Sequence, residues 1–194
     1  AKIVYDDPKA AKYVWGAGFH WYVGDFYDNV QMTHDAYPDK KLLFTEGCQE
    51  GGPHLNDWRV GERYGKNIIM DLNRWTVGWV DWNLLLDMEG GPNHVWNLCS
   101  APVLADSTTN TYYHVNSYYY IGHFSKYIRP GAKRIAAGST KDNLLTTAFK
   151  NTDGSIAVVV MNIDEWGSSF ALKFIDQAAK VWLPARSIAT YIIK

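Results

Sequence analysis

The sequence lacks the features that mark membrane, metal-binding and disulfide-rich proteins. Its 194 residues include only two cysteines, Cys48 and Cys99, in unrelated contexts and without metal-ligand spacing, so no disulfide framework is implied. No apolar run approaches the roughly 20 residues that span a bilayer, and no signal peptide precedes the first strand-like segment. The formal net charge of −1 gives no basis for binding nucleic acid or an anionic membrane. We therefore expect no cofactor, no metal, no nucleic-acid partner and no membrane span.

Aromatic residues are abundant instead. They make up 15% of the chain, with 9 Trp and 13 Tyr. Each of these side chains combines a flat apolar face with a polar edge, which suits a sugar ring as well as a protein core. Composition alone leaves both readings open.

The first two thirds of the chain alternate strand and helix patterns. The apolar segments 13–22, 41–46 and 76–87 are predicted to be strands, and a long polar loop is predicted over 88–113. Helices are predicted after Asp7-Pro8, from Asp25 to Ala36, from Asn56 or Asp57 through Leu72, and around 121–128. Strands that are apolar on both faces and separated by helices indicate a parallel sheet covered by helices.

Each predicted strand ends in polar or aromatic residues. The ends are His20-Trp21-Tyr22, then Glu46 in "LLFTEGC", then Asp81-Trp82-Asn83. In parallel α/β folds the carboxyl ends of the strands face the ligand site. A glutamate in this position is a candidate functional residue, and an ordinary surface residue remains the alternative.

The last 60 or so residues have a different pattern. Short segments rich in Val, Ile and Thr follow residue 133, and "NTDGS" at 151–155 is a hairpin signal because Asp153-Gly154 tolerates positive φ. This all-β module has too few strands to close a barrel or a full sandwich alone. We expect it to pack against other elements.

Four motifs, "HWY", "LLFTEGC", "VGWVDWNLLLDMEGGPN" and "GHFSKYIRPG", resemble the carboxy-terminal part of glycoside hydrolase family 30. This family includes glucosylceramidases, β-glucosidases, β-xylosidases and β-1,6-glucanases, and the resemblance covers nearly the whole chain. It implies strands six to eight of a (β/α)8 barrel in residues 1–130 and part of a β-sandwich side domain in residues 131–194. It also implies retaining hydrolysis of a β-glycoside and, by analogy, a secreted or periplasmic bacterial enzyme.

The resemblance assigns roles to individual residues. Glu46 matches the catalytic nucleophile, and Tyr22 matches a tyrosine that orients it. Trp82 matches a tryptophan of the sugar subsite, and Asn97 an asparagine of the loop over the pocket. Trp21 and His20 lie on the strand end of Tyr22 and are further substrate-binding candidates, while Cys48 matches a free thiol beside the nucleophile.

One part of the family pattern is missing. The general acid/base is a second glutamate, in an Asn-Glu pair at the end of the fourth strand, and no such strand occurs here. We therefore expect a partner, an N-terminal barrel portion that carries this glutamate, and we expect the 194 residues alone to be incomplete and inactive.

Simpler roles are favoured for several other residues. We expect Trp75, Trp79 and Trp96 to pack in the core or against helices, Asp81 to be a paired barrel-interior carboxylate, and Glu89 to order its loop. Glu50 and Glu62 are expected to be solvated, Cys48 to be a tolerated small residue, and His20 to be as suited to a structural hydrogen bond as to a substrate.

Three functions remain at this point. The chain is the nucleophile-bearing part of a retaining β-glycosidase, with glucosides favoured over xylosides or β-1,6-glucan. Alternatively it is a sugar-binding remnant without the acid, or an α/β-plus-β module in which Glu46 is incidental.

Overall fold

The computed structural model describes residues 1–194, which form two compact units. The first unit comprises residues 1–55 and 67–115, and the second comprises residues 56–66 and 116–194. None of the helices has both the length and the hydropathy needed to cross a bilayer.

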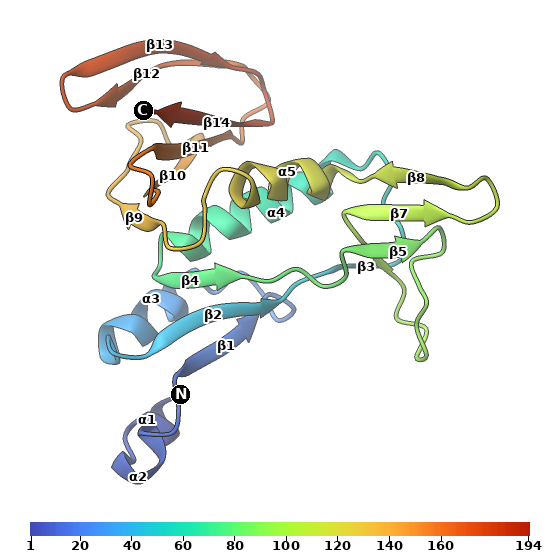
Figure 1. The fold of residues 1–194 in the computed structure, drawn as a ribbon, viewed down its shortest axis with the longest axis horizontal. Helices are drawn as coiled ribbons and strands as arrows, with labels where there is room; N and C mark the ends of the chain where they lie inside the picture. Colours follow the sequence, from blue (N-terminus) through green and yellow to red (C-terminus); the bar gives the residue numbers. More distant parts are fainter. The chain divides into compact units, whose positions relative to one another are not determined.

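A parallel sheet forms the centre of the first unit (Figure 1). Its strands β1 (Gly16–His20), β2 (Lys41–Glu46) and β4 (Thr76–Trp79) lie in the order β1-β2-β4, and both pairs are parallel. Leu42 and Phe44 of β2 are buried, and the Phe44 ring stacks on Trp79 with centroids 4.2 Å apart and planes 4° from parallel. The predicted parallel sheet is thus confirmed, and β2 begins and ends at the predicted residues.

The helices that precede β4 are α1 (Lys2–Tyr5), α2 (Pro8–Ala11), α3 (Tyr27–Ala36) and α4 (Trp58–Leu72). The caps at Asp7 and Asp57 are confirmed, since their carboxylates accept from backbone N–H groups two residues later, at 2.8 and 3.1 Å. The predicted cap at Asp25 is wrong, because α3 begins after Phe26 and has no side-chain cap. The helical stripe of α4 is buried as predicted, at Val60, Tyr64, Ile68 and Leu72.

The predicted third strand, 76–87, is in fact two strands in different sheets. β4 ends at Trp79, and Asn83 then adopts a left-handed φ of 61°, which interrupts the extended backbone. Strand β5 (Leu85–Asp87) follows and pairs with β7 (Val103–Asp106) rather than continuing β4. The sequence gives no sign of this break, because the residues on both sides of it are mostly apolar.

The predicted polar loop 88–113 also contains regular structure. β7 forms an antiparallel hairpin with β8 (Thr111–His114), and β6 (Cys99–Ser100) pairs with β3 (Gln49–Glu50), which follows the nucleophile candidate. The hairpin turn is ordered by Asp106, whose carboxylate accepts from the hydroxyls of Thr108 and Thr109 at 2.6 and 2.7 Å. Polar composition here reflects a turn and not an unstructured loop.

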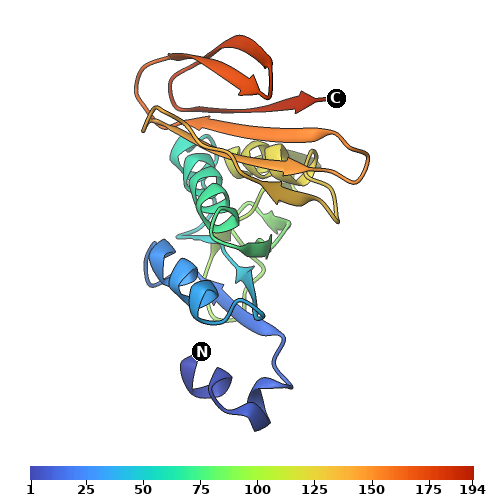
Figure 2. The ribbon, with the colours of Figure 1, turned by 90° about the vertical axis from the view of Figure 1, so that its left-hand side faces the viewer.

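The second unit is a β-sandwich with the helix α5 (Asn116–Ser125) and the N-terminal part of α4. One antiparallel sheet has the order β14-β11-β10-β9, and a hairpin of β12 and β13 packs over one of its faces (Figures 1 and 2). The strands are β9 (Lys133–Ile135), β10 (Leu144–Lys150), β11 (Ile156–Asn162), β12 (Ser168–Phe174), β13 (Gln177–Leu183) and β14 (Ser187–Ile193). The core between the layers includes Leu144, Ile156, Val158, Val160 and Leu183. The hairpin predicted at 151–155 is confirmed, with Gly154 at φ 89°, whereas β13 was not predicted.

Two glycines allow close packing within the second unit. A Cβ at Gly61 would lie 2.4 Å from Tyr120 Cδ2, and one at Gly65 would lie 2.6 Å from Tyr120 Cδ1. The N-terminal half of α4 can therefore approach the Tyr120 ring of α5 only because these positions lack a side chain.

Glu62 is not solvated as predicted. Arg186 Nε donates to Glu62 Oε1 at 3.0 Å, and Arg186 Nη1 donates to Glu165 Oε1 at 2.9 Å. The Glu62 carboxylate raises the pKa of Arg186 above its ordinary value, mainly through the hydrogen bond. A long-range ion pair of this kind leaves no local signal in the sequence.

Candidate active site

Glu46 stands at the carboxyl end of β2, in the wall of a cleft of about 620 Å³. Trp82 and Asn97 line the same cleft, although they are 36 and 51 residues further along the chain. The cleft is large enough for a sugar ring, since small-molecule sites span roughly 300–1,000 Å³. Three of the six predicted site residues therefore line this one cleft.

Tyr22 contacts the carboxylate of Glu46 directly. Its hydroxyl donates to Glu46 Oε1 at 2.9 Å and lies 3.7 Å from Cys48 Sγ. Burial, together with hydrogen bonds to Cys48 and Glu46, raises the pKa of Tyr22 well above its ordinary value. The phenol therefore stays protonated and can serve as a donor to a charged carboxylate.

Trp82 is held beside Glu46 by its backbone. Its N–H donates to Gly47 O at 2.8 Å, and Asp81 Oδ1 accepts from the same N–H at 3.0 Å. The side chain is 47% exposed, so much of the indole is free to contact a ligand. This is the arrangement that a sugar-stacking residue needs.

Another part of the cleft lining is a loop that is held in place by hydrogen bonds from its own side chains. Asp87 Oδ1 accepts from Glu89 N and Gly91 N at 2.9 and 2.8 Å, and Asn93 Nδ2 donates to Asn97 O at 2.7 Å. The side chain of Glu89 is not among the residues that line the cleft. Its backbone belongs to the ordered loop, in line with the role expected for this residue.

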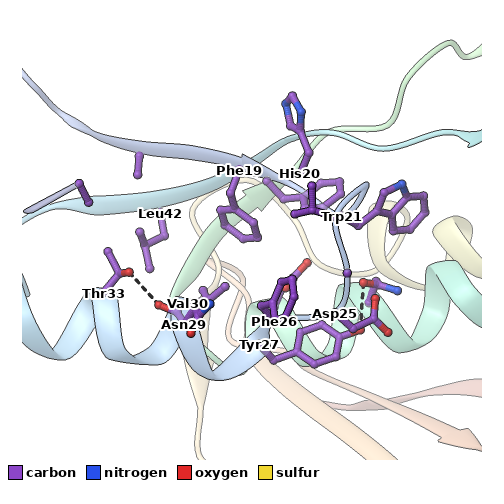
Figure 3. Close-up of a pocket in the computed structure, with 17 residues that line it drawn as sticks. Phe19, His20, Trp21, Asp25, Phe26, Tyr27, Asn29, Val30, Thr33 and Leu42 are labelled. Atoms are coloured by element: carbon purple, nitrogen blue, oxygen red, sulfur yellow. Dashed lines mark hydrogen bonds between the residues drawn. The ribbon is translucent and has the colours of Figure 1, made fainter.

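His20 and Trp21 lie elsewhere, on a second cavity of about 190 Å³ beside α3 and β1 (Figure 3). His20 Nε2 is 3.0 Å from Thr45 Oγ1, and Figure 3 shows its ring pointing away from the α3 side of the strand. Trp21 is only 3% exposed and packs edge-on against Phe44 and Trp79. Neither lines the cleft of Glu46, so their proposed contact with substrate has no support from this geometry.

The two cysteines, which the sequence placed in unrelated contexts, are neighbours. Cys48 Sγ and Cys99 Sγ are 3.1 Å apart, both are free thiols, and both are buried. Burial is the main cause that raises the pKa of Cys48 to about 12. The reading of Cys48 as merely a tolerated small residue therefore misses a specific contact.

Some cleft residues were not singled out from the sequence. Pro92, Asn93, His94 and Val95 line the cleft next to Asn97. The motif "VGWVDWNLLLDMEGGPN" was the signal in the sequence, because its last two residues are Pro92 and Asn93.

The three tryptophans that were expected to pack in the core or against helices have different environments in the structure. Trp79 is a packing residue, as expected. Trp75 stacks on His34, with ring centroids 4.2 Å apart. Trp96 is 82% exposed with φ 59°, so its expected packing role is wrong.

The cleft has one carboxylate among its lining residues, Glu46. It is mounted on a strand end, which is more rigid than a loop, and is held by a protonated phenol beside an aromatic wall. This set can place an anionic nucleophile next to a sugar ring. It does not include a second carboxyl group to act as an acid.

Comparison with known proteins gives matches across both units. Residues 1–128 match the glycosyl hydrolase family 30 TIM-barrel domain, and residues 131–191 match the family 30 beta sandwich domain. The chain is 39% identical over 172 residues to lysosomal acid glucosylceramidase of Mus musculus, covering 84% of this chain and 33% of the mouse protein. It is 24% identical to an endo-1,6-beta-D-glucanase of Neurospora crassa, covering 95% of this chain and 40% of that protein. The chain thus spans about a third of the length of the curated relatives.

Solved structures agree with these matches. SrfJ from Salmonella typhimurium superposes with a TM-score of 0.96 at 35% identity, over 100% of this chain and 44% of SrfJ. The endo-beta1,6-glucanase BT3312 superposes with a TM-score of 0.88 at 32% identity, over 98% of this chain and 44% of that enzyme. The parallel strands are therefore the carboxy-terminal portion of a TIM barrel, followed by a β-sandwich domain. The chain belongs to glycosyl hydrolase family 30.

Proposed function

We propose that this chain is the nucleophile-bearing part of a retaining β-glycosidase that hydrolyses β-glucosides. The observation that carries the proposal is the 2.9 Å hydrogen bond from Tyr22 to Glu46, at a strand end in a cleft shared with Trp82. Family membership supports glycoside hydrolysis as the reaction class.

The proposed chemistry uses two displacements. Glu46 attacks the anomeric carbon as the bond to the aglycone oxygen breaks, and the aglycone leaves with a proton from the acid. Water then attacks the covalent glycosyl-enzyme, gives a proton to the same group acting as base, and releases the sugar and free Glu46. Tyr22 holds the carboxylate aimed at the sugar by donating a hydrogen bond to it, and Trp82 stacks on the apolar face of the ring. A retaining enzyme needs a second carboxyl about 5–5.5 Å from the nucleophile to act first as acid and then as base.

The second carboxyl is proposed to come from an N-terminal barrel portion of about 250 residues or more, which also supplies the other five strands. In the first unit both outer strands of the three-stranded sheet have an unpaired edge, and Val77 of β4 and Leu84 after it are exposed. We call this chain together with that portion the assembled enzyme. Residues 1–130 are proposed to belong to its catalytic barrel and residues 131–194 to its side domain.

The preferred substrate is a β-glucoside of the glucosylceramide type, because the curated relatives in the 33–39% identity range are named as glucosylceramidases. A β-1,6-glucan is the second candidate, supported by the likeness to an endo-beta1,6-glucanase. Comparing kcat/KM for an aryl-β-glucoside with that for β-1,6-linked glucose oligomers separates them.

Azide rescue tests the mechanism. Glu46→Gly in the assembled enzyme should have almost no activity on an aryl-β-glucoside, and added azide should restore turnover by yielding the glycosyl azide of inverted anomeric configuration. Glu50→Gly is the matched control, because Glu50 is an exposed glutamate on the following strand. Loss of activity without formation of the azide product would count against Glu46 as the nucleophile.

A further inference from the structure

The sulfur atoms of Cys48 and Cys99 are closer than an ordinary van der Waals contact between two sulfurs. Their separation is 3.1 Å, and a disulfide bond is about 2.05 Å long. The side chains therefore need to move by only about 1 Å in total to form a bond.

The backbone holds the two cysteines in this position. β3, which begins directly after Cys48, pairs with β6, which begins at Cys99. Gly51 N and Gly52 N both donate to Leu98 O, at 3.0 and 2.8 Å, and Cys99 N donates to Gly90 O at 2.9 Å. Pre-ordering of this kind removes most of the chain entropy that a new cross-link would otherwise cost.

We propose that Cys48 and Cys99 form a redox-active dithiol, which a peroxide converts reversibly to a disulfide, and that this disulfide lowers the activity of the adjacent nucleophile. The link to activity rests on the proposed function. The site itself does not, because it depends only on the positions of the two thiols.

The order of the two thiol reactions follows from their surroundings. Both thiols are buried, but Cys99 belongs to the lining of the cleft and Cys48 does not, so we assign the first reaction with a small peroxide to Cys99. Its sulfur attacks one peroxide oxygen, the O–O bond breaks, and Cys99 becomes a sulfenic acid with release of one water.

Cys48 then resolves this intermediate. Its sulfur attacks the sulfur of Cys99, the S–O bond breaks, and the departing hydroxide leaves as water with the Cys48 proton. Overall two thiols and one hydrogen peroxide give one disulfide and two waters, with two electrons passing from sulfur to oxygen.

The pair is connected to the nucleophile by one side chain. Tyr22 hydroxyl lies 3.7 Å from Cys48 Sγ and donates to Glu46 Oε1 at 2.9 Å. Cys48 Sγ is thus a second, more distant acceptor for the hydroxyl that donates to Glu46. Bonding Cys48 to Cys99 moves this sulfur and changes the surroundings of the hydroxyl that holds Glu46.

The pair is also connected to the loop of Asn97. Cys99 Sγ donates to Asn97 O at 3.5 Å, and Asn97 lines the cleft. A disulfide removes this donor and ties the loop of Asn97 to the strand end of Glu46. Both effects change the geometry around the nucleophile.

Mass spectrometry tests the site without reference to activity. The assembled enzyme treated with hydrogen peroxide should lose both alkylatable thiols, lose about 2 Da at this pair, and release a Cys48–Cys99 cross-linked peptide. Dithiothreitol should restore both thiols. Cys48→Ser and Cys99→Ser are the controls, since neither can form the cross-link. Sulfinic or sulfonic acid alone, or no modification, would overturn the dithiol assignment.

Kinetics tests the effect on the nucleophile. The cross-linked enzyme should show a kcat at least about fivefold below its reduced form, and dithiothreitol should reverse the loss. Cys99→Ser, which lacks the thiol that reacts first, should keep its own untreated kcat after the same treatment. A cross-linked enzyme with unchanged kcat would refute the control of Glu46, whereas an untreated enzyme without any glycosidase activity would refute the proposed function and leave the mass result valid.

Discussion

Removing the hydroxyl of Tyr22 is the perturbation whose effect can be worked out most fully. Tyr22→Phe deletes one oxygen, and with it the 2.9 Å hydrogen bond to Glu46 Oε1. The ring is retained, and so is its edge contact with His20 at 5.6 Å between centroids. The change therefore affects the nucleophile more than the packing.

The size of the effect follows from the charge of the acceptor. A hydrogen bond to a charged group contributes about 1.5–3 kcal/mol, and each 1.36 kcal/mol of barrier is about a tenfold change in rate. If the bond aligns Glu46 for attack, kcat should fall by roughly 10- to 150-fold. KM should change little, because Tyr22 is not among the residues that line the cleft and its hydroxyl contacts the nucleophile instead.

Steady-state kinetics on an aryl-β-glucoside with the assembled enzyme measures this directly. Tyr13→Phe is the matched control, because Tyr13 is a largely exposed tyrosine at which the same atom is removed. Its kcat and KM should stay within about twofold of the parent enzyme. An unchanged kcat for Tyr22→Phe, or a rise in KM alone, would refute the role of Tyr22 in positioning the nucleophile.

Three further predictions follow from single contacts. Trp82→Ala should raise KM about threefold to tenfold with a smaller change in kcat, because it removes a stacking surface worth roughly 0.5–1.5 kcal/mol; an unchanged KM would exclude Trp82 from the subsite. Burial raises the pKa of Asp71 to about 7, so the protonated form of this carboxyl is favoured in the folded state. The free energy of unfolding should therefore fall by up to roughly 4 kcal/mol as pH rises from about 4 to about 7. Asp71→Asn should flatten that pH dependence in denaturant titrations, and a parent-like slope in the variant would assign it to other groups. Gly61→Ala should lower the free energy of unfolding by about 1–3 kcal/mol, because its Cβ would lie 2.4 Å from Tyr120 Cδ2. Gly122→Ala in α5 is the control and should be neutral or stabilising, because no atom lies near its Cβ. Equal effects of the two substitutions would contradict the packing argument.

The elements that could be predicted from sequence are those with a local signal. β2 was predicted correctly because an apolar run is bounded by a lysine pair and a glycine, and α4 because its buried residues recur at helical spacing. The long strand predicted over 76–87 failed because apolar composition does not report the left-handed conformation of Asn83.

The candidate site was predictable only in part, for a related reason. Glu46 and Trp82 could be predicted to lie near each other, because they follow the carboxyl ends of neighbouring parallel strands and these ends meet at the same side of the sheet. Trp21, which packs inward, and Tyr22, which reaches Glu46, both lie in the turn after β1, so the alternation of a strand could not have separated their roles. The contact between Cys48 and Cys99 could not be predicted either, because it depends on a pairing of strands 50 residues apart.

Covalent labelling tests the central claim most directly. A 2-deoxy-2-fluoro-β-glucoside with a good leaving group should inactivate the assembled enzyme by trapping the glycosyl-enzyme, and peptide mapping should place the 2-fluoroglucosyl group on Glu46. The account predicts one label per active site, and none on the Glu46→Gln variant. A label on a different carboxylate, or an inverting enzyme that forms no adduct, would contradict it.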